Sequence, residues 1–181
     1  MQGMVLEKFG KSQSVIRSED VRFLTGNGAY VDDISPASAL VAYVLRAPVA
    51  HARIVALDLA EACACDGVHM VITAADLHAA GVALDMTAST VSNLDGSQGA
   101  APVRPILAQN RVRFAGEAVA VVIADSLEVA RDAAEQITVD YDELPVHLSL
   151  QAGGEPLHNE APENRAFDWG FGTKDATEAA F

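Results

Sequence analysis

An unbroken apolar run at residues 118–124 constrains the fold of this chain more than any other feature. Its seven residues, AVAVVIA, are rich in β-branched side chains and stop at Asp125. A run this short, ended by a polar residue, is typical of a β-strand that is buried on both faces. Burying Val121, Val122 and Ile123 stabilises a fold by roughly 1.5–3 kcal/mol each. The sequence therefore predicts a core strand that the rest of the chain must cover.

A helix is predicted directly after this strand. Asp125 and Ser126 carry side-chain oxygens that can cap the first turn. The apolar residues Leu127, Ala130 and Ala134 follow at i, i+3 and i+7, which places them on one face of a helix. We expect this face to pack on the sheet.

The hydrophobic period changes to two at Ile137, which predicts a half-buried strand. Ile137, Val139 and Tyr141 alternate with polar residues, and Pro145 ends the segment. Strand, helix and strand within residues 118–145 together predict a packed nucleus of mixed secondary structure.

Shorter segments upstream are predicted to cover this nucleus. Residues 39–46 and 68–73 predict strands, and residues 59–64 predict a short helix. A further strand is predicted at residues 52–59. The residues expected to share one of its faces are Arg53, Val55, Leu57 and Leu59.

A capping box predicts one more helix. Thr73 and Asp76 are three residues apart, as the N-cap and N3 residues of such a box are. The predicted helix extends to Ala80, and Gly81 ends it.

The remaining segments have weaker patterns. Residues 82–103 are rich in small polar residues and predict a functional lid-like or interface loop. Residues 146–152 predict an edge strand, and residues 153–173 an extended arm. Asp175 as N-cap and Glu178 as N3 predict a helix that the chain barely begins. We therefore expect the chain to be the front part of a longer polypeptide.

Composition excludes several classes of function. With 181 residues, half of them apolar, the chain has the size of one domain. It has 25 acidic and 12 basic residues, a formal net charge of −13, which argues against nucleic acid and anionic membranes as partners. No apolar run is long enough to span a bilayer, and residues 1–20 contain no signal-peptide core.

The two cysteines, Cys63 and Cys65, are too close in sequence for an easy disulfide and lack the partners of a zinc site. We expect them to pack as small apolar groups. Together with the absence of a leader sequence, they favour the cytoplasm.

Two glycine-containing motifs are too incomplete to indicate nucleotide binding. Gly10-Lys11-Ser12 ends like a phosphate-binding loop, but Val5 stands where that loop needs its first glycine. Gly26-Asn27-Gly28 lacks the third glycine and the preceding strand of a dinucleotide-binding fingerprint. A turn is predicted there instead.

The remaining polar candidates have simpler structural interpretations. Asp32-Asp33 predicts an exposed turn, and His51 a hydrogen-bonded structural residue. Gly116-Glu117 predicts a turn or bulge before the core strand. The carboxylates of Asp140, Asp142 and Glu143 are predicted to lie on a solvated face. No complete active site follows from residue spacing.

Four blocks of sequence, in one order, resemble a known family. They are RSEDVRFLTGNGAYVDDI (17–34), LRAPVAHARI (45–54), DGVHMVITAADL (66–77) and the stretch from RPILAQNRVRFAGEAVAVVIAD to YDELP (104–145). Together they resemble the amino-terminal hammerhead domain of the molybdenum hydroxylase large subunit. This family includes aerobic carbon monoxide dehydrogenase, xanthine dehydrogenase and aldehyde oxidase.

The Leu157-His158-Asn159 and Asn164 region also resembles the stretch that leads into the molybdopterin-binding domain of that family.

The resemblance implies an α+β fold, the α/β-hammerhead, in which two main helices pack on mixed strands. It divides the chain into an N-terminal arm (1–16), the hammerhead domain (17–152) and an extended arm (153–181) that leads to a cofactor-binding domain.

The resemblance also implies an oxidoreductase that oxidises CO or hydroxylates an aldehyde or N-heterocycle with oxygen from water. The implied centre is a molybdenum–molybdopterin cytosine dinucleotide, bound outside this chain. Electrons would pass to 2Fe–2S clusters on a small subunit and then to FAD on a medium subunit, within a homodimer of heterotrimers.

The family blocks begin within twenty residues of Met1, with no cluster-binding cysteines before them. This favours separate subunits, as in the carbon monoxide dehydrogenase type. The family's catalytic and cofactor-contacting residues map beyond residue 181, so no catalytic, cofactor or metal residue is predicted here. The chain itself is expected to be a catalytically silent scaffold. The alternative is a free-standing interaction domain with the same fold.

Overall fold

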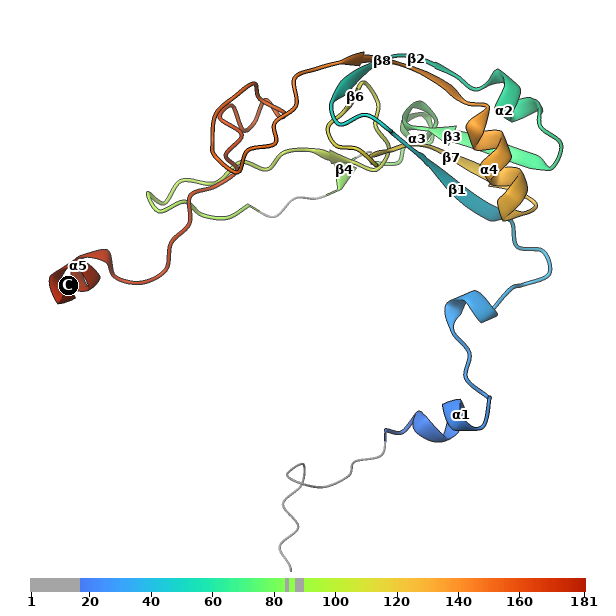
Figure 1. The fold of residues 1–181 in the computed structure, drawn as a ribbon, viewed down its shortest axis with the longest axis horizontal. Helices are drawn as coiled ribbons and strands as arrows, with labels where there is room; N and C mark the ends of the chain where they lie inside the picture. Colours follow the sequence, from blue (N-terminus) through green and yellow to red (C-terminus); the bar gives the residue numbers. More distant parts are fainter. Residues whose placement is uncertain (1–16, 84, 87–89) are drawn as a thin grey trace, which may run out of the picture. The chain divides into compact units, whose positions relative to one another are not determined.

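The computed structural model describes residues 17–83, 85–86 and 90–181 (Figure 1). The chain divides into two compact units, Met1–Ala39 and Leu40–Phe181. The predicted arm at residues 1–16, with Gly10-Lys11-Ser12, lies outside the described residues. Among the described residues, no helix has both the length and the apolar character needed to cross a bilayer.

The first unit contains a short helix, α1 (Asp20–Leu24), and a 3₁₀ turn, η1 (Val31–Asp33). The predicted turn at Gly26-Asn27-Gly28 is confirmed, because Gly26 has φ +73° and the Asn27 N–H is bonded to the Arg22 carbonyl. The Phe23 and Tyr30 rings stack across this turn, 5.7 Å apart. Asp32 and Asp33 are exposed, as predicted.

The second unit is built on an antiparallel sheet whose central strand is the predicted core strand. This strand, β7 (Ala118–Ala124), lies between β1 (Val41–Arg46) and β3 (Val68–Thr73), in the order β1-β7-β3. Figure 1 shows α4 lying against this sheet. The α+β class predicted for the chain is confirmed.

The prediction that β7 is buried on both faces is wrong for most of its length. Ala120, Val122 and Ala124 are fully buried, whereas Val121 and Ile123 remain partly exposed. The reason is that α2 (Ala60–Ala64) and α4 (Leu127–Glu135) cover one face of the sheet. The other face has a buried residue only at its start, Val119, which belongs to a second core cluster.

The helix α4 occurs where predicted, and the Ser126 hydroxyl accepts the Val129 N–H at 3.3 Å as its cap. Its buried face consists of Ala130, Ala133 and Ala134, however, and Leu127 is 45% exposed. Leu127 is the first residue of the helix, at the edge of the sheet contact. The three alanines bring the helix close to β7, since their side chains are small.

A second antiparallel sheet has the order β6-β2-β8. Its strands are β6 (Arg111–Val112), β2 (Ala52–Asp58) and β8 (Thr138–Glu143). The strands before and after α4 therefore belong to different sheets. The predicted alternation in β8 is confirmed, because Val139 and Tyr141 pack on the core while Asp140 and Asp142 are exposed.

The predicted face of β2 is only half right. Leu57 and Leu59 pack on the core, but Arg53 and Val55 are exposed, and Ala52 and Ile54 point inward instead. The register of β2 against β8 shifts between Ile54 and Ala56. A bulge inserts one residue and reverses the inward and outward parity of everything beyond it.

The capping box is confirmed. The Thr73 hydroxyl accepts the Asp76 N–H, and the Asp76 carboxylate accepts the Thr73 N–H at 2.8 Å, at the start of α3 (Ala74–Ala79). Of the two cysteines predicted to pack as apolar groups, Cys65 contacts the core. Cys63 is exposed, so the prediction is wrong for that residue.

The loop at residues 82–103 contains β4 (Asp85–Met86), which pairs with β5 (Arg104–Pro105).

The edge strand predicted at residues 146–152 is not formed, and residues 153–173 have no regular secondary structure, as predicted. The terminal helix α5 (Lys174–Ala180) begins one residue before Asp175, so Thr173 and not Asp175 is its N-cap.

Candidate functional site

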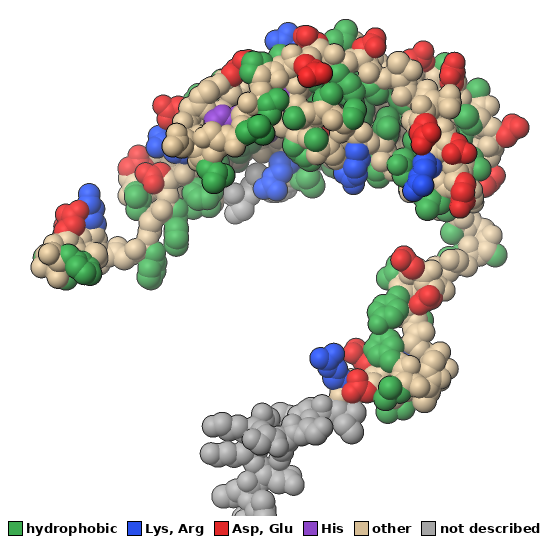
Figure 2. All heavy atoms as spheres, viewed as in Figure 1, with side chains coloured by type: hydrophobic (Ala, Val, Ile, Leu, Met, Phe, Trp, Pro, Cys, Tyr) green, Lys and Arg blue, Asp and Glu red, His purple; other side chains and the backbone are tan. Residues whose placement is uncertain are grey.

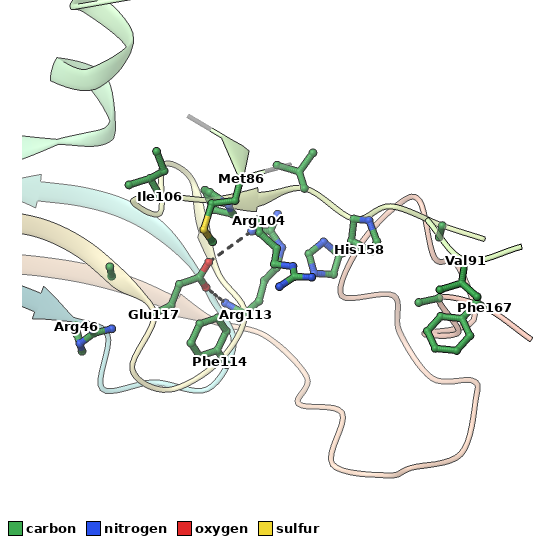
Figure 3. Close-up of a pocket in the computed structure, with 16 residues that line it drawn as sticks. Arg46, Met86, Val91, Arg104, Ile106, Arg113, Phe114, Glu117, His158 and Phe167 are labelled. Carbon is green, nitrogen blue, oxygen red and sulfur yellow. Dashed lines mark hydrogen bonds and ion pairs between the residues drawn. The ribbon is translucent and has the colours of Figure 1, made fainter. Parts of the chain in front are cut away.

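The second unit contains an open cleft of about 800 Å³ at the end of the first sheet (Figure 3). Segments far apart in sequence form its walls: the last residue of β1, the β4–β5 pair, the turn before β7, and residues 158–167. Pockets of this size are within the range that holds small ligands or peptide side chains. We call this feature the arginine cleft because Arg46, Arg104 and Arg113 line it.

Each arginine is placed by a feature of the local backbone. Arg104 is brought beside the cleft by antiparallel pairing with Met86. Arg46 ends β1, where the register against β7 shifts, and its Nη1 donates to the Gly116 carbonyl at 2.8 Å. Gly116 has φ +94°, a conformation that favours glycine. The turn or bulge predicted at Gly116-Glu117 is thereby confirmed.

Glu117 fixes the third arginine. It is 4% exposed, and its carboxylate accepts the Arg113 backbone N–H (Figure 3, dashed lines). The Arg113 Nη1 lies 4.0 Å from the other carboxylate oxygen. A buried carboxylate needs such partners, because an unpaired charge away from water is costly. Glu117 therefore holds Arg113 in place, and both of its carboxylate oxygens already have a partner.

His158 adds a neutral polar group to the cleft. Burial lowers the pKa of His158, and the nearby positive charge of Arg113 lowers it further, although Glu160 acts in the opposite direction. The imidazole is therefore uncharged near neutral pH. Apolar walls complete the cleft, from Met86, Ile106, Phe114 and Phe167.

The charge of the cleft is opposite to that of the chain. Three guanidinium groups face it, and Glu117 is the one carboxylate among the lining residues. The whole chain has a net charge of −13, and Figure 2 shows acidic side chains scattered over the face in view. Arginine forks match carboxylates and phosphates, so the cleft can bind an anionic group that also has an apolar part.

Across residues 17–83, 85–86 and 90–181, no three His, Cys, Asp or Glu side chains gather as metal ligands. Two cysteines are also half of what a 2Fe–2S cluster requires. We therefore assign none of the described residues to a metal ion.

The residues discussed from sequence lie mostly outside the cleft. His51 is 2% exposed, and its Nδ1 lies 2.7 Å from the Pro145 carbonyl oxygen, which confirms a hydrogen-bonded structural role. Its Nε2 is buried without a hydrogen-bond partner among the described residues. Asp140, Asp142 and Glu143 are exposed on β8, as predicted.

Sequence reasoning missed the arginines. One signal was available, since Arg104, Arg111 and Arg113 are three of only 12 basic residues and fall within ten positions. Arg46 carried no signal, because its place in the cleft depends on the pairing of β1 with β7.

Comparison with known proteins identifies the family to which this fold belongs. Residues 25–145 match the family model described as "Aldehyde oxidase and xanthine dehydrogenase, a/b hammerhead domain". The chain is 36% identical over 179 residues to the carbon monoxide dehydrogenase large chain of Hydrogenophaga pseudoflava. This alignment covers 90% of this chain and 21% of that protein. It is 38% identical to the nicotine 6-hydroxylase large subunit of Paenarthrobacter nicotinovorans, covering 83% of this chain and 18% of that protein.

Solved structures agree with the sequence comparisons. The reconstituted CO dehydrogenase from Oligotropha carboxidovorans superposes with a TM-score of 0.70 at 33% identity, over 92% of this chain and 21% of that one. Quinoline 2-oxidoreductase from Pseudomonas putida 86 superposes with a TM-score of 0.66 at 42% identity. The superposition covers 73% of this chain and 16% of that one.

This chain spans about one fifth of the length of these relatives. The resemblance drawn from the four sequence blocks is confirmed by the matched family model and by the large chains among the relatives. The chain therefore belongs to the aldehyde oxidase and xanthine dehydrogenase family and contains its a/b hammerhead domain.

Proposed function

We propose that this chain is the hammerhead domain of the large subunit of a molybdenum hydroxylase of the carbon monoxide dehydrogenase type. One observation carries the proposal. Two carbon monoxide dehydrogenase large chains align with 90% and 91% of the chain, yet the chain spans only 21% of each. The rest of such a subunit would carry the catalytic residues.

In this proposal the chain is a catalytically silent scaffold within an oxidoreductase. The complete subunit binds a molybdenum–molybdopterin cytosine dinucleotide outside these residues, and it assembles with a 2Fe–2S small subunit and an FAD-binding medium subunit in the cytoplasm. The molybdenum centre supplies two-electron oxidation of CO, an aldehyde or an N-heterocycle. The hammerhead contributes packing surface to that assembly.

The gene downstream of Phe181 provides the first test. Several hundred further codons, with neighbouring genes for cluster-binding and FAD-binding subunits, are expected. The complex purified from its source organism should then contain near-stoichiometric molybdenum by elemental analysis, together with iron and flavin. A stop codon directly after Phe181 would favour the alternative, a free-standing interaction domain with the same fold.

Metal analysis of the isolated 181-residue chain gives a second, independent prediction. We expect the chain expressed alone to bind no molybdenum, because in this proposal the residues that contact the cofactor lie beyond residue 181. The cells must also make active molybdenum hydroxylase, so that the cofactor is available. Near-stoichiometric molybdenum in the purified chain would contradict the scaffold role.

A further inference from the structure

Three exposed aromatic residues begin at the wall of the arginine cleft and continue along the chain from it. Phe167, Trp169 and Phe171 are spaced by two and are 51%, 63% and 96% exposed. The Trp169 and Phe171 rings stack with centroids 6.5 Å apart. We call these three residues the aromatic stripe. Phe167 also lines the cleft, so the stripe begins at the cleft wall (Figure 3).

The backbone of the stripe is held by the loop at residues 90–100. The Asp168 N–H donates to the Asn93 side chain at 2.8 Å, and the Asp168 carbonyl accepts the Leu94 N–H at 2.9 Å. The Ala100 N–H donates to the Ala166 carbonyl at 2.7 Å. The two segments approach so closely at Gly99 that a Cβ there would lie 2.9 Å from the Ala166 oxygen.

The backbone at Ala166 and Asp168 is thus fixed, while the aromatic side chains of the stripe face solvent. Large aromatic side chains gathered in a fixed, exposed position are typical of binding surfaces rather than of free surface.

The cleft next to the stripe favours a ligand group with negative charge. Arg46 and Arg104 face it, and its one lining carboxylate, Glu117, is already taken up by Arg113. The cleft therefore offers guanidinium groups to a carboxylate from elsewhere. The strong negative charge of the remaining chain disfavours the same acidic segment at other places on the surface.

We propose that the arginine cleft and the aromatic stripe together dock a carboxylate-bearing, partly apolar segment of the large-subunit polypeptide that follows residue 181. This inference rests on the proposed function, in which the subunit continues beyond these residues. Relatives have about four fifths of their length outside the matched region, which leaves ample polypeptide to cover this surface.

Tethering also favours this occupant over another chain. Phe171 is ten residues from Phe181, and ten extended residues span at most roughly 35 Å. A segment that continues the same chain therefore stays near the surface at a high effective concentration, which a separate subunit or a second copy lacks.

Photo-crosslinking in the full-length large subunit tests the proposal. p-Benzoylphenylalanine is placed at Phe114, which is 59% exposed in the isolated domain and lines the cleft, or at Trp169 in the stripe. After irradiation and digestion, mass spectrometry should identify crosslinked peptides from beyond residue 181 that contain Asp or Glu. The same amino acid at Val55, exposed on the bulge of β2, is the control and should not capture those peptides.

Charge reversal provides a second arm. Arg104→Glu should reduce the crosslink yield from Phe114 at least fivefold, whereas Arg104→Lys should retain most of it. Arg53→Glu, an equal change of charge on the exposed side of β2, should leave the yield unchanged. Circular dichroism melting of each variant confirms that the subunit is still folded.

Crosslinks to another subunit or to a second copy, or no crosslink at all, would overturn the proposal, as would equal yields from the Arg104→Glu and Arg53→Glu variants. These outcomes leave the proposed function intact. A gene that ends at Phe181 would instead contradict the proposed function, and this result is obtained independently of the crosslinking experiment.

Discussion

Glu117 shows how one buried side chain organises the cleft. Its carboxylate accepts the Arg113 N–H and lies 4.0 Å from the Arg113 guanidinium, while its backbone bonds to Ala47 at the end of β1. The same residue therefore joins the turn before β7 to β1 and orients an arginine.

We expect Glu117→Leu to lower the free energy of unfolding by about 2 kcal/mol, because the Arg113 N–H loses its acceptor in a buried position. Glu117→Gln keeps an acceptor oxygen of similar reach and should lose less than half as much. Urea denaturation followed by circular dichroism measures both changes. Equal losses in the two variants would show that the hydrogen bond does not explain the effect.

His158 predicts a pH dependence of stability. Burial and Arg113 hold the pKa of His158 below its ordinary value of 6.5 in the folded chain. The unfolded chain then binds more protons once the pH falls below about 6.5, so the free energy of unfolding should decrease from there down to the folded pKa.

His158→Gln removes this group and should make stability depend less on pH between 7.5 and 5.5. Urea denaturation at several pH values in that interval compares the two proteins, in which the other four histidines are unchanged. The same pH dependence in both would exclude the expected contribution of His158.

At the scale of elements, β7 and α4 determine the main core. Alanines of α4 pack on the face of β7 that carries Ala120, Val122 and Ala124. The opposite face of the strand is only partly covered, so adjacent residues of one strand should contribute very differently to stability.

We expect Val122→Ala to cost about 2 kcal/mol, because it removes two buried methyl groups and leaves a cavity beneath α4. Val121→Ala on the partly exposed face should cost less than half of that. Chemical denaturation of the two variants provides a matched comparison. Similar losses would mean that both faces are equally buried, as the sequence pattern had indicated.

At the scale of the whole chain, the exposed aromatic stripe predicts self-association in isolation. Apolar patches that normally face a partner tend to pair with one another when the partner is missing. We expect light scattering to show a mass above 19.0 kDa at high protein concentration.

The triple variant Phe167→Ser, Trp169→Ser and Phe171→Ser should shift the isolated chain towards monomer. A matched triple variant of exposed apolar residues elsewhere, Val55→Ser, Met70→Ser and Leu127→Ser, serves as control. A clean monomer of the unmodified chain at high concentration would count against an uncovered docking surface.

Local pattern sufficed for much of the fold. The core strand β7, the capped helix α4, the alternation of β8 and the Thr73–Asp76 capping box were all predicted from residues within one or two turns or strand repeats. These features depend on interactions between near neighbours in sequence, which residue type and spacing encode directly.

Other features were missed because they depend on the partner of an element. The bulge at Val55 reversed the face of β2, and helices on one side of the first sheet left Val121 half covered. The hydrophobic period of a strand does not reveal a bulge or an uncovered face. Both depend on the neighbouring strand or helix that packs against the strand.

The sequence by itself determined the family, the α+β class and the strongly acidic composition. The tertiary structure alone decided the arginine cleft and the aromatic stripe. Arg46 in β1 and Arg104 in β5 are 58 residues apart and belong to different sheets, yet both line one cleft, and the loop at residues 90–100 holds the backbone at Ala166 and Asp168. Contacts between residues so distant in the chain have no local signature, so the docking surface became visible only once the strands were paired.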